Sequence, residues 1–159
     1  ADKSVFVWES ASAKEVRKLT GLPAAVRAVA LPADGKGVLA AFSDGSAAQY
    51  DLATGKEMKQ YPGPKSPASA MVLPTRGDTA LIAHEDGTIA SHPLAGGAAK
   101  TWKAAGPVTA LAVRPDGSAV AAASGKQVQL FSLDGKEVGK VAAPAAVRGL
   151  AYSTDSKRL

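Results

Sequence analysis

Four polar side chains recur at nearly even spacing along this 159-residue chain. Each is the second residue of a short apolar segment, and together they are Arg27, Ser69, Thr109 and Arg148. If the segments are equivalent strands, we expect these side chains around one opening of a shared channel. Guanidinium groups in that place could bind a carboxylate, a phosphate or an acidic peptide. The alternative is that the arginines extend to solvent from packed strands.

Residue types that support catalysis or metal binding are sparse. The chain has no cysteine and two histidines, His84 and His92, whereas a zinc site requires three or four convergent ligands. We expect His92 to pack within its sheet and His84 to hydrogen bond near the turn that follows it. No pattern places a nucleophile, a base and an orienting group together, and the G-x-S-x-G signature is absent. The sequence therefore predicts no metal, no cofactor and no enzymatic activity.

The net charge of +5 raises the question of nucleic-acid binding. The lysines recur in one segment of each repeated unit, as at Lys14, Lys56 and Lys136, and form no run interleaved with aromatic residues. We interpret them as charges on exposed edge strands, where they oppose aggregation, and expect no nucleic-acid partner. The apolar runs are far shorter than the roughly 18 residues of a membrane span, so no membrane partner is expected. Nothing in the sequence indicates a cellular compartment.

Internal repeats determine the predicted architecture. Similar segments of alternating apolar residues begin about 40 residues apart, a period typical of repeated supersecondary units; they start at Val26, Ala68, Val108 and Val147. A second register has the same spacing and places a ring residue near the end of another strand in each unit: Trp8, Tyr50, His92 and Phe131.

Each unit divides into four short strands separated by turn residues. The first strand ends in a Pro, Asp and Gly turn, and the second is rich in Ala, Val and Leu. The second strand closes on Asp44-Gly45 or Asp86-Gly87, and Asp-Gly between apolar strands is a strong hairpin signal. A glycine turn then leads to a Lys-rich fourth strand. We predict an all-β fold of four-stranded antiparallel units, with Asp44 and Asp86 as structural turn residues.

The segments VFVWE and QYDLATGKE, with the recurring V…LA…PDG pattern, resemble tryptophan-aspartate (WD) repeats. Trp8, followed by Glu9, retains the tryptophan of that motif, Tyr50-Asp51 is a close variant, and the other two units have diverged. The resemblance implies β-propeller blades of four antiparallel strands. It also implies a non-catalytic scaffold that binds a protein or a peptide.

The unit boundaries predict a single domain, residues 1–159, with one blade split between its ends. Three blades are complete, at 24–63, 64–106 and 107–144. Residues 4–21 would supply the third and fourth strands of the split blade, and residues 146–159 its first strand and the beginning of its second.

Several modes of closure are compatible with a split blade. One chain could close as a four-bladed ring, but propellers of the resembled family normally have about seven or eight blades. We favour two copies in an eight-bladed homodimer, because two-fold dimers are the commonest assembly. The alternatives are a fragment of a longer propeller that retains only assembly, and a ligand-binding or enzymatic propeller with a site in its central channel.

Overall fold

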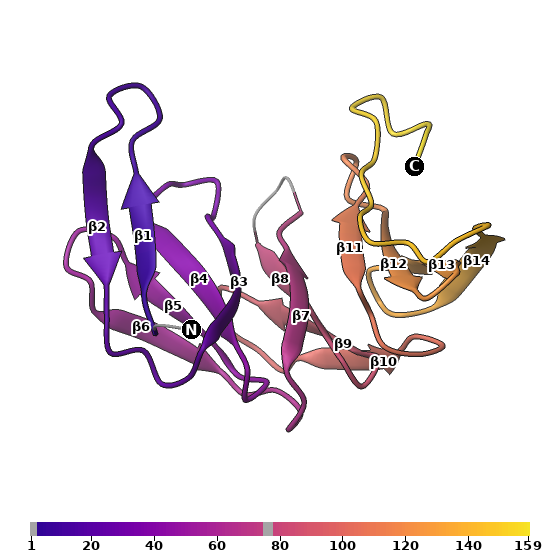
Figure 1. The fold of residues 1–159 in the computed structure, drawn as a ribbon, viewed down its shortest axis with the longest axis horizontal. Helices are drawn as coiled ribbons and strands as arrows, with labels where there is room; N and C mark the ends of the chain where they lie inside the picture. Colours follow the sequence, from indigo (N-terminus) through magenta and orange to yellow (C-terminus); the bar gives the residue numbers. More distant parts are fainter. Residues whose placement is uncertain (1–2, 75–77) are drawn as a thin grey trace.

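The computed structural model describes residues 3–74 and 78–159, and it confirms the predicted all-β class (Figure 1). These residues form four antiparallel sheets and include no helix, and hence none long and apolar enough to cross a membrane. The turn expected at residues 75–77 lies outside the described part of the chain.

Three of the sheets have four strands each, and every one falls within a single predicted repeat unit. The N-terminal sheet consists of β1 (Val5–Trp8) and β2 (Glu15–Leu19). The first four-stranded sheet comprises β3 (Val26–Ala30), β4 (Gly37–Phe42), β5 (Ala47–Asp51) and β6 (Glu57–Tyr61). The second comprises β7 (Ala68–Val72), β8 (Thr79–His84), β9 (Thr88–Pro93) and β10 (Lys100–Lys103). The third comprises β11 (Ala110–Val113), β12 (Ala119–Ser124), β13 (Gln127–Ser132) and β14 (Glu137–Ala142).

Each sheet is a meander in which every strand pairs with its neighbours in sequence. Local turn chemistry explains this order. Gly45 and Gly87 both adopt positive φ, which glycine accepts without steric cost. The preceding carboxylates close the same turns, since Asp44 accepts a hydrogen bond from the Ser46 backbone N–H at 3.0 Å and Asp86 one from Thr88 at 2.9 Å.

The sheets stack face to face, and the apolar core lies between them. The first strands are neighbours, because β3 contacts β7 and β7 contacts β11. The second strands β4, β8 and β12 are almost fully buried on both faces, which explains their high content of small apolar residues. Figure 1 shows the result as an open arc with β2, β6, β10 and β14 on its outer side.

The two terminal segments do not form one sheet within a single chain. The strand β1 pairs with β2 alone, and residues 146–159 contain no strand. The N-terminal sheet and the C-terminal segment lie at opposite ends of the arc (Figure 1). Three stacked sheets do not turn far enough to bring these ends together, so one chain does not close a four-unit ring.

Candidate functional site

The antiparallel order of the strands gathers several polar residues at one edge of the molecule. In each four-stranded sheet the beginning of the first strand and the end of the second strand lie at the same end. The linkers before β3, β7 and β11 therefore meet the Asp-Gly turns there. We call this edge the first-strand rim. Its polar members include Arg27, Asp44, Ser69, Glu85, Asp86, Lys103, Thr109 and Arg148.

Arg27 on the rim connects the first four-stranded sheet to the second. Its Nη2 atom lies 2.6 Å from Glu85 Oε1, and its Nε–H donates to the Ala68 carbonyl oxygen at 3.3 Å. Both side chains of the ion pair remain about half exposed, so solvent screens their attraction and the pair adds little stability. The contact nevertheless occupies the guanidinium group that the sequence suggested for ligand binding.

Thr109 makes the corresponding contact two repeats later. Its hydroxyl donates to the Val147 carbonyl oxygen at 2.8 Å. Arg27 and Thr109 follow Val26 and Val108, the first residues of two of the aligned repeat segments. Each donates to the carbonyl of the first residue of the next aligned segment, Ala68 or Val147. Ser69 has a buried hydroxyl with no hydrogen-bond partner among the described residues, and Arg148 is exposed on the C-terminal segment.

A second ion pair lies beside the first on the rim. Lys103 Nζ is 2.7 Å from Asp86 Oδ2 and also donates to the Asp86 carbonyl oxygen at 3.1 Å. Partial burial raises the pKa of Asp86, but hydrogen bonds from Lys103 and Thr88 outweigh it and hold the pKa at about 2. Asp86 is therefore ionised at neutral pH, and the rim around it carries paired charges of both signs.

The two histidines lie in the interior between the first and second four-stranded sheets. His84 is fully buried, with Nδ1 3.1 Å from the Ser66 carbonyl oxygen, close to the turn as the sequence suggested. His92 packs edge-on against the Tyr61 ring at a centroid distance of 5.4 Å. The described residues include no group of three or more side chains that could hold a metal ion.

Burial makes these histidines sensitive to acid. Burial lowers the pKa of His84 below 6.5, and Lys103 adds to this, while Ser66 and Asp86 oppose it. Burial likewise lowers the pKa of His92, assisted by the charges of His84 and Lys59. Because the unfolded chain then binds protons more readily, the free energy of unfolding should fall as pH drops below 6.5. The limiting slope is about 1.4 kcal/mol per pH unit for each histidine.

Urea denaturation at pH 7 and pH 5.5 measures this effect. The double variant His84→Phe/His92→Tyr is the matched control, since Phe42 and Tyr50 occupy the equivalent places in the first four-stranded sheet. We expect the wild-type protein to lose stability over this interval and the double variant to lose much less. An equal loss in both proteins would assign the acid sensitivity to other groups.

At the edge of the molecule opposite the first-strand rim, two side chains join neighbouring sheets, and the sequence analysis did not predict these contacts. Arg17 on β2 donates from Nε to the Leu52 carbonyl oxygen at 2.8 Å, and Lys59 on β6 donates to the Leu94 carbonyl oxygen at 3.1 Å. On β10, Trp102 pairs with Ile89 as Tyr61 pairs with Ala47, and it packs against the ring of Phe131 at a centroid distance of 6.2 Å. Arg17 and Lys59 therefore join neighbouring sheets, beyond the role of charged edge residues. The shared position of Arg17 and Lys59 in their repeats was the available signal.

A cavity of about 470 Å³ opens beside the first-strand rim. Pro23 from the linker before β3 and the turn residues Asp44 and Ser46 form its rim side. Phe42 and Tyr61 contribute apolar walls. The volume lies in the range of small-ligand and side-chain pockets in proteins. The rim thus combines one apolar cavity with paired surface charges.

No family model matches the chain, and no curated protein matches it at a significant level.

Proposed function

We propose that this chain forms β-propeller blades of the WD-repeat type and acts as a non-catalytic scaffold that binds a protein or a peptide. Three features support the propeller arrangement: one four-stranded meander per repeat, first strands adjacent on the inner side of the arc, and turn aspartates at equivalent places. The repeated strand and turn sequences are those that resemble the WD motif.

The cavity at the first-strand rim is the observation that carries the binding proposal. A peptide crossing the rim could place an apolar side chain against the exposed prolines Pro23 and Pro62 of the cavity. The carboxylates of Asp44 and Glu57 at the cavity would receive a donor group of the same peptide. Few anchors supply most of the affinity in such interfaces, so one well-filled cavity can support binding.

An acidic ligand held by the rim arginines has less support. Arg27 already pairs with Glu85 at 2.6 Å, and an acidic ligand would have to displace this carboxylate. Of the two rim arginines, Arg148 alone is exposed without such a pair among the described contacts.

A peptide-display selection followed by fluorescence anisotropy tests the proposal. Gln60 is exposed and lines the cavity, so Gln60→Trp should cover the cavity without altering a turn. We expect peptides selected on the wild-type chain to bind Gln60→Trp at least about tenfold more weakly, a loss of about 1.4 kcal/mol. Lys36→Trp, at the opposite end of the sheet, should leave binding unchanged. Failure to select any peptide, or equal binding to both variants, would contradict rim recognition.

A further inference from the structure

One face of the N-terminal sheet is exposed although the equivalent face is buried in every other sheet. Trp8 is 57% exposed, whereas the residues in its register are almost completely covered: Tyr50 at 5%, His92 at 4% and Phe131 at 2%. Each covered ring packs against the preceding sheet, as His92 does against Tyr61 and Phe131 against Trp102. No sheet formed by the described residues packs on the face that carries Trp8 and the neighbouring Phe6.

The strand β3 shows the same difference on the inner side of the arc. Val29 is 48% exposed, whereas its equivalents Met71 and Leu111 are 8% and 6% exposed. Met71 and Leu111 belong to core clusters that include residues of the preceding sheet. The exposed apolar surface at the N-terminal end of the arc therefore has two parts. One part is formed by Trp8 and Phe6 on β1, and the other by Val29 on β3.

The C-terminal segment already occupies the place of a first strand at the other end. Val147, Leu150 and Tyr152 pack against the core of the third four-stranded sheet. The Val147 backbone N–H donates to the Gly125 carbonyl oxygen at 2.8 Å. The opposite side of the segment, with Gly149 and Ala151, is exposed.

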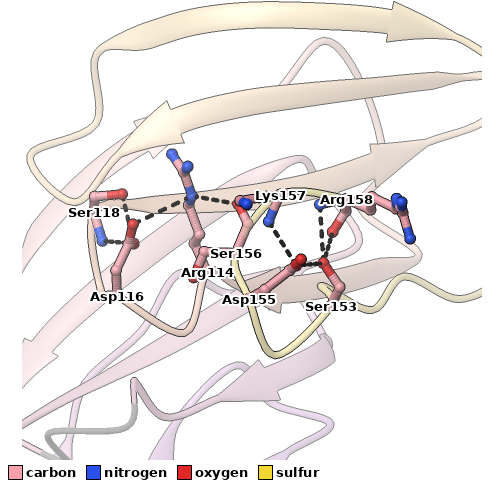
Figure 2. Close-up of polar contacts among 8 residues, drawn as sticks. All are labelled: Arg114, Asp116, Ser118, Ser153, Asp155, Ser156, Lys157 and Arg158. Atoms are coloured by element: carbon pink, nitrogen blue, oxygen red, sulfur yellow. Dashed lines mark hydrogen bonds and ion pairs between the residues drawn. The ribbon is translucent and has the colours of Figure 1, made fainter.

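The turn after this segment repeats the turn between β11 and β12, and Figure 2 shows the two side by side. The Ser156 N–H donates to the Ser153 carbonyl oxygen at 2.9 Å, as the Gly117 N–H does to that of Arg114 at 2.8 Å. Arg114 Nε–H donates to the Ser156 carbonyl oxygen at 3.0 Å and joins the turns. Contacts with the third four-stranded sheet thus hold the segment in the conformation of a first strand and its following turn, although no further sheet in the described part of the chain packs on its other side.

The two ends complement each other at three points. Trp8 on β1 is an exposed apolar side chain, and β14 presents an exposed apolar side chain, Val141, near Gly139. Gly139 pairs with Leu130 as Arg17 pairs with Val7 and Lys59 with Gln49, so it occupies the place of these two long side chains, and no side chain there obstructs an indole. Val29 faces the absent inner strand, whereas Gly149 and Ala151 present a small-residue surface of the kind that β3 and β7 offer with Ala28 and Ala70. Arg148 is the unused member of the series in which Arg27 and Thr109 donate to the next repeat.

We propose that the exposed face of the N-terminal sheet docks on the third four-stranded sheet and C-terminal segment of a second copy of this chain. The inference rests on the propeller arrangement proposed above. Two such contacts related by a two-fold axis close two chains head to tail. In each contact Trp8 covers Val141 of the other copy, and Arg148 donates to the carbonyl of Val26 there. We expect micromolar affinity for this contact.

Light scattering coupled to size-exclusion chromatography, over a hundredfold range of protein concentration, tests the proposal. The chain has a mass of 16.0 kDa, and at high concentration the mass should double. Trp8→Lys and Val141→Lys should each weaken association by at least about a hundredfold, since each places a charge in an apolar contact. Met58→Lys is the matched control, because Met58 is an exposed apolar residue of β6 that lies on neither end face. Far-UV circular dichroism of all variants establishes that they are folded.

Mixing the two disrupted variants tests the head-to-tail geometry itself. A dimer of Trp8→Lys with Val141→Lys keeps one contact in which both faces are wild type, so the mixture should associate although neither variant does alone. A monomer at every concentration, a dimer insensitive to both substitutions, or no rescue on mixing would overturn the proposal. Masses that rise beyond the dimer would also overturn it, because they indicate open chains. Peptide binding by the monomeric Trp8→Lys variant would show that rim recognition is independent of this assembly.

Discussion

Replacement of Gly45 by alanine is expected to lower the free energy of unfolding by more than about 3 kcal/mol. Gly45 has a φ of +89°, which alanine rarely adopts, and its turn touches the linker to the second four-stranded sheet. A Cβ atom there would lie 1.8 Å from the Pro64 carbonyl oxygen and 2.6 Å from that of Ser66. The obstacle is backbone, so the turn and the linker must separate to admit the methyl group.

Gly35→Ala is the matched control for this substitution. Gly35 also has positive φ, +64°, but an added Cβ would meet no atom within 4 Å. We expect it to cost about 1 kcal/mol, the penalty of the left-handed conformation alone. Urea denaturation of both variants measures the difference, which isolates the contact between the turn and the linker. Equal losses would show that the turn and the linker can move apart without cost.

The contact is tight from both sides. A Cβ atom on Gly63, in the same linker, would lie 1.9 Å from the Gly45 carbonyl oxygen. Two glycines, one in the β4–β5 turn and one in the linker after β6, thus allow these backbones to approach more closely than side chains permit. This approach positions β7 beside β3, and with it the Arg27 contact to Ala68 on the rim.

Truncation of Phe42 to alanine is expected to destabilise the protein by about 3 to 5 kcal/mol. Phe42 is fully buried and belongs to the core cluster between the N-terminal sheet and the first four-stranded sheet. That cluster includes Val5 and Leu19, and it is the apolar contact that holds β1 and β2 in place. We expect the loss to be accompanied by faster backbone hydrogen exchange in the N-terminal sheet, because local opening there exposes little other surface.

Met58→Ala serves as the control for Phe42→Ala. Met58 is an exposed residue of β6, and its truncation should change the free energy of unfolding by no more than about 0.5 kcal/mol. Phe42→Leu should give an intermediate loss, since it keeps most of the apolar volume. A small effect of Phe42→Ala on both stability and exchange would mean that the N-terminal sheet is held by other contacts.

The repeat positions show how much of the core was readable from the sequence. Tyr50, His92 and Phe131 were aligned by spacing alone, and all three are buried at equivalent places between sheets. Trp8 shares their register but is exposed. The alternation of apolar residues specifies which face of a strand a side chain occupies. It does not specify whether another sheet covers that face, which depends on the position of the sheet in the stack.

The rim residues were only partly predictable for the same reason. Asp44 and Asp86 bind backbone groups two residues away, so their turns could be inferred from local sequence. Arg27 pairs with Glu85, which lies 58 residues later and on another sheet. The cavity beside the rim likewise combines a linker, a turn and the end of β6.

By itself, the sequence determined the strands, the turns and the four-stranded units, because φ preferences, hydrogen bonds within turns and apolar alternation act between residues close together in the chain. The tertiary structure alone decided that the arc stays open, that Arg27 joins two sheets, and which apolar faces remain uncovered. These outcomes depend on the angle and distance at which whole sheets pack, and many weak contacts between residues far apart in the sequence set that geometry together.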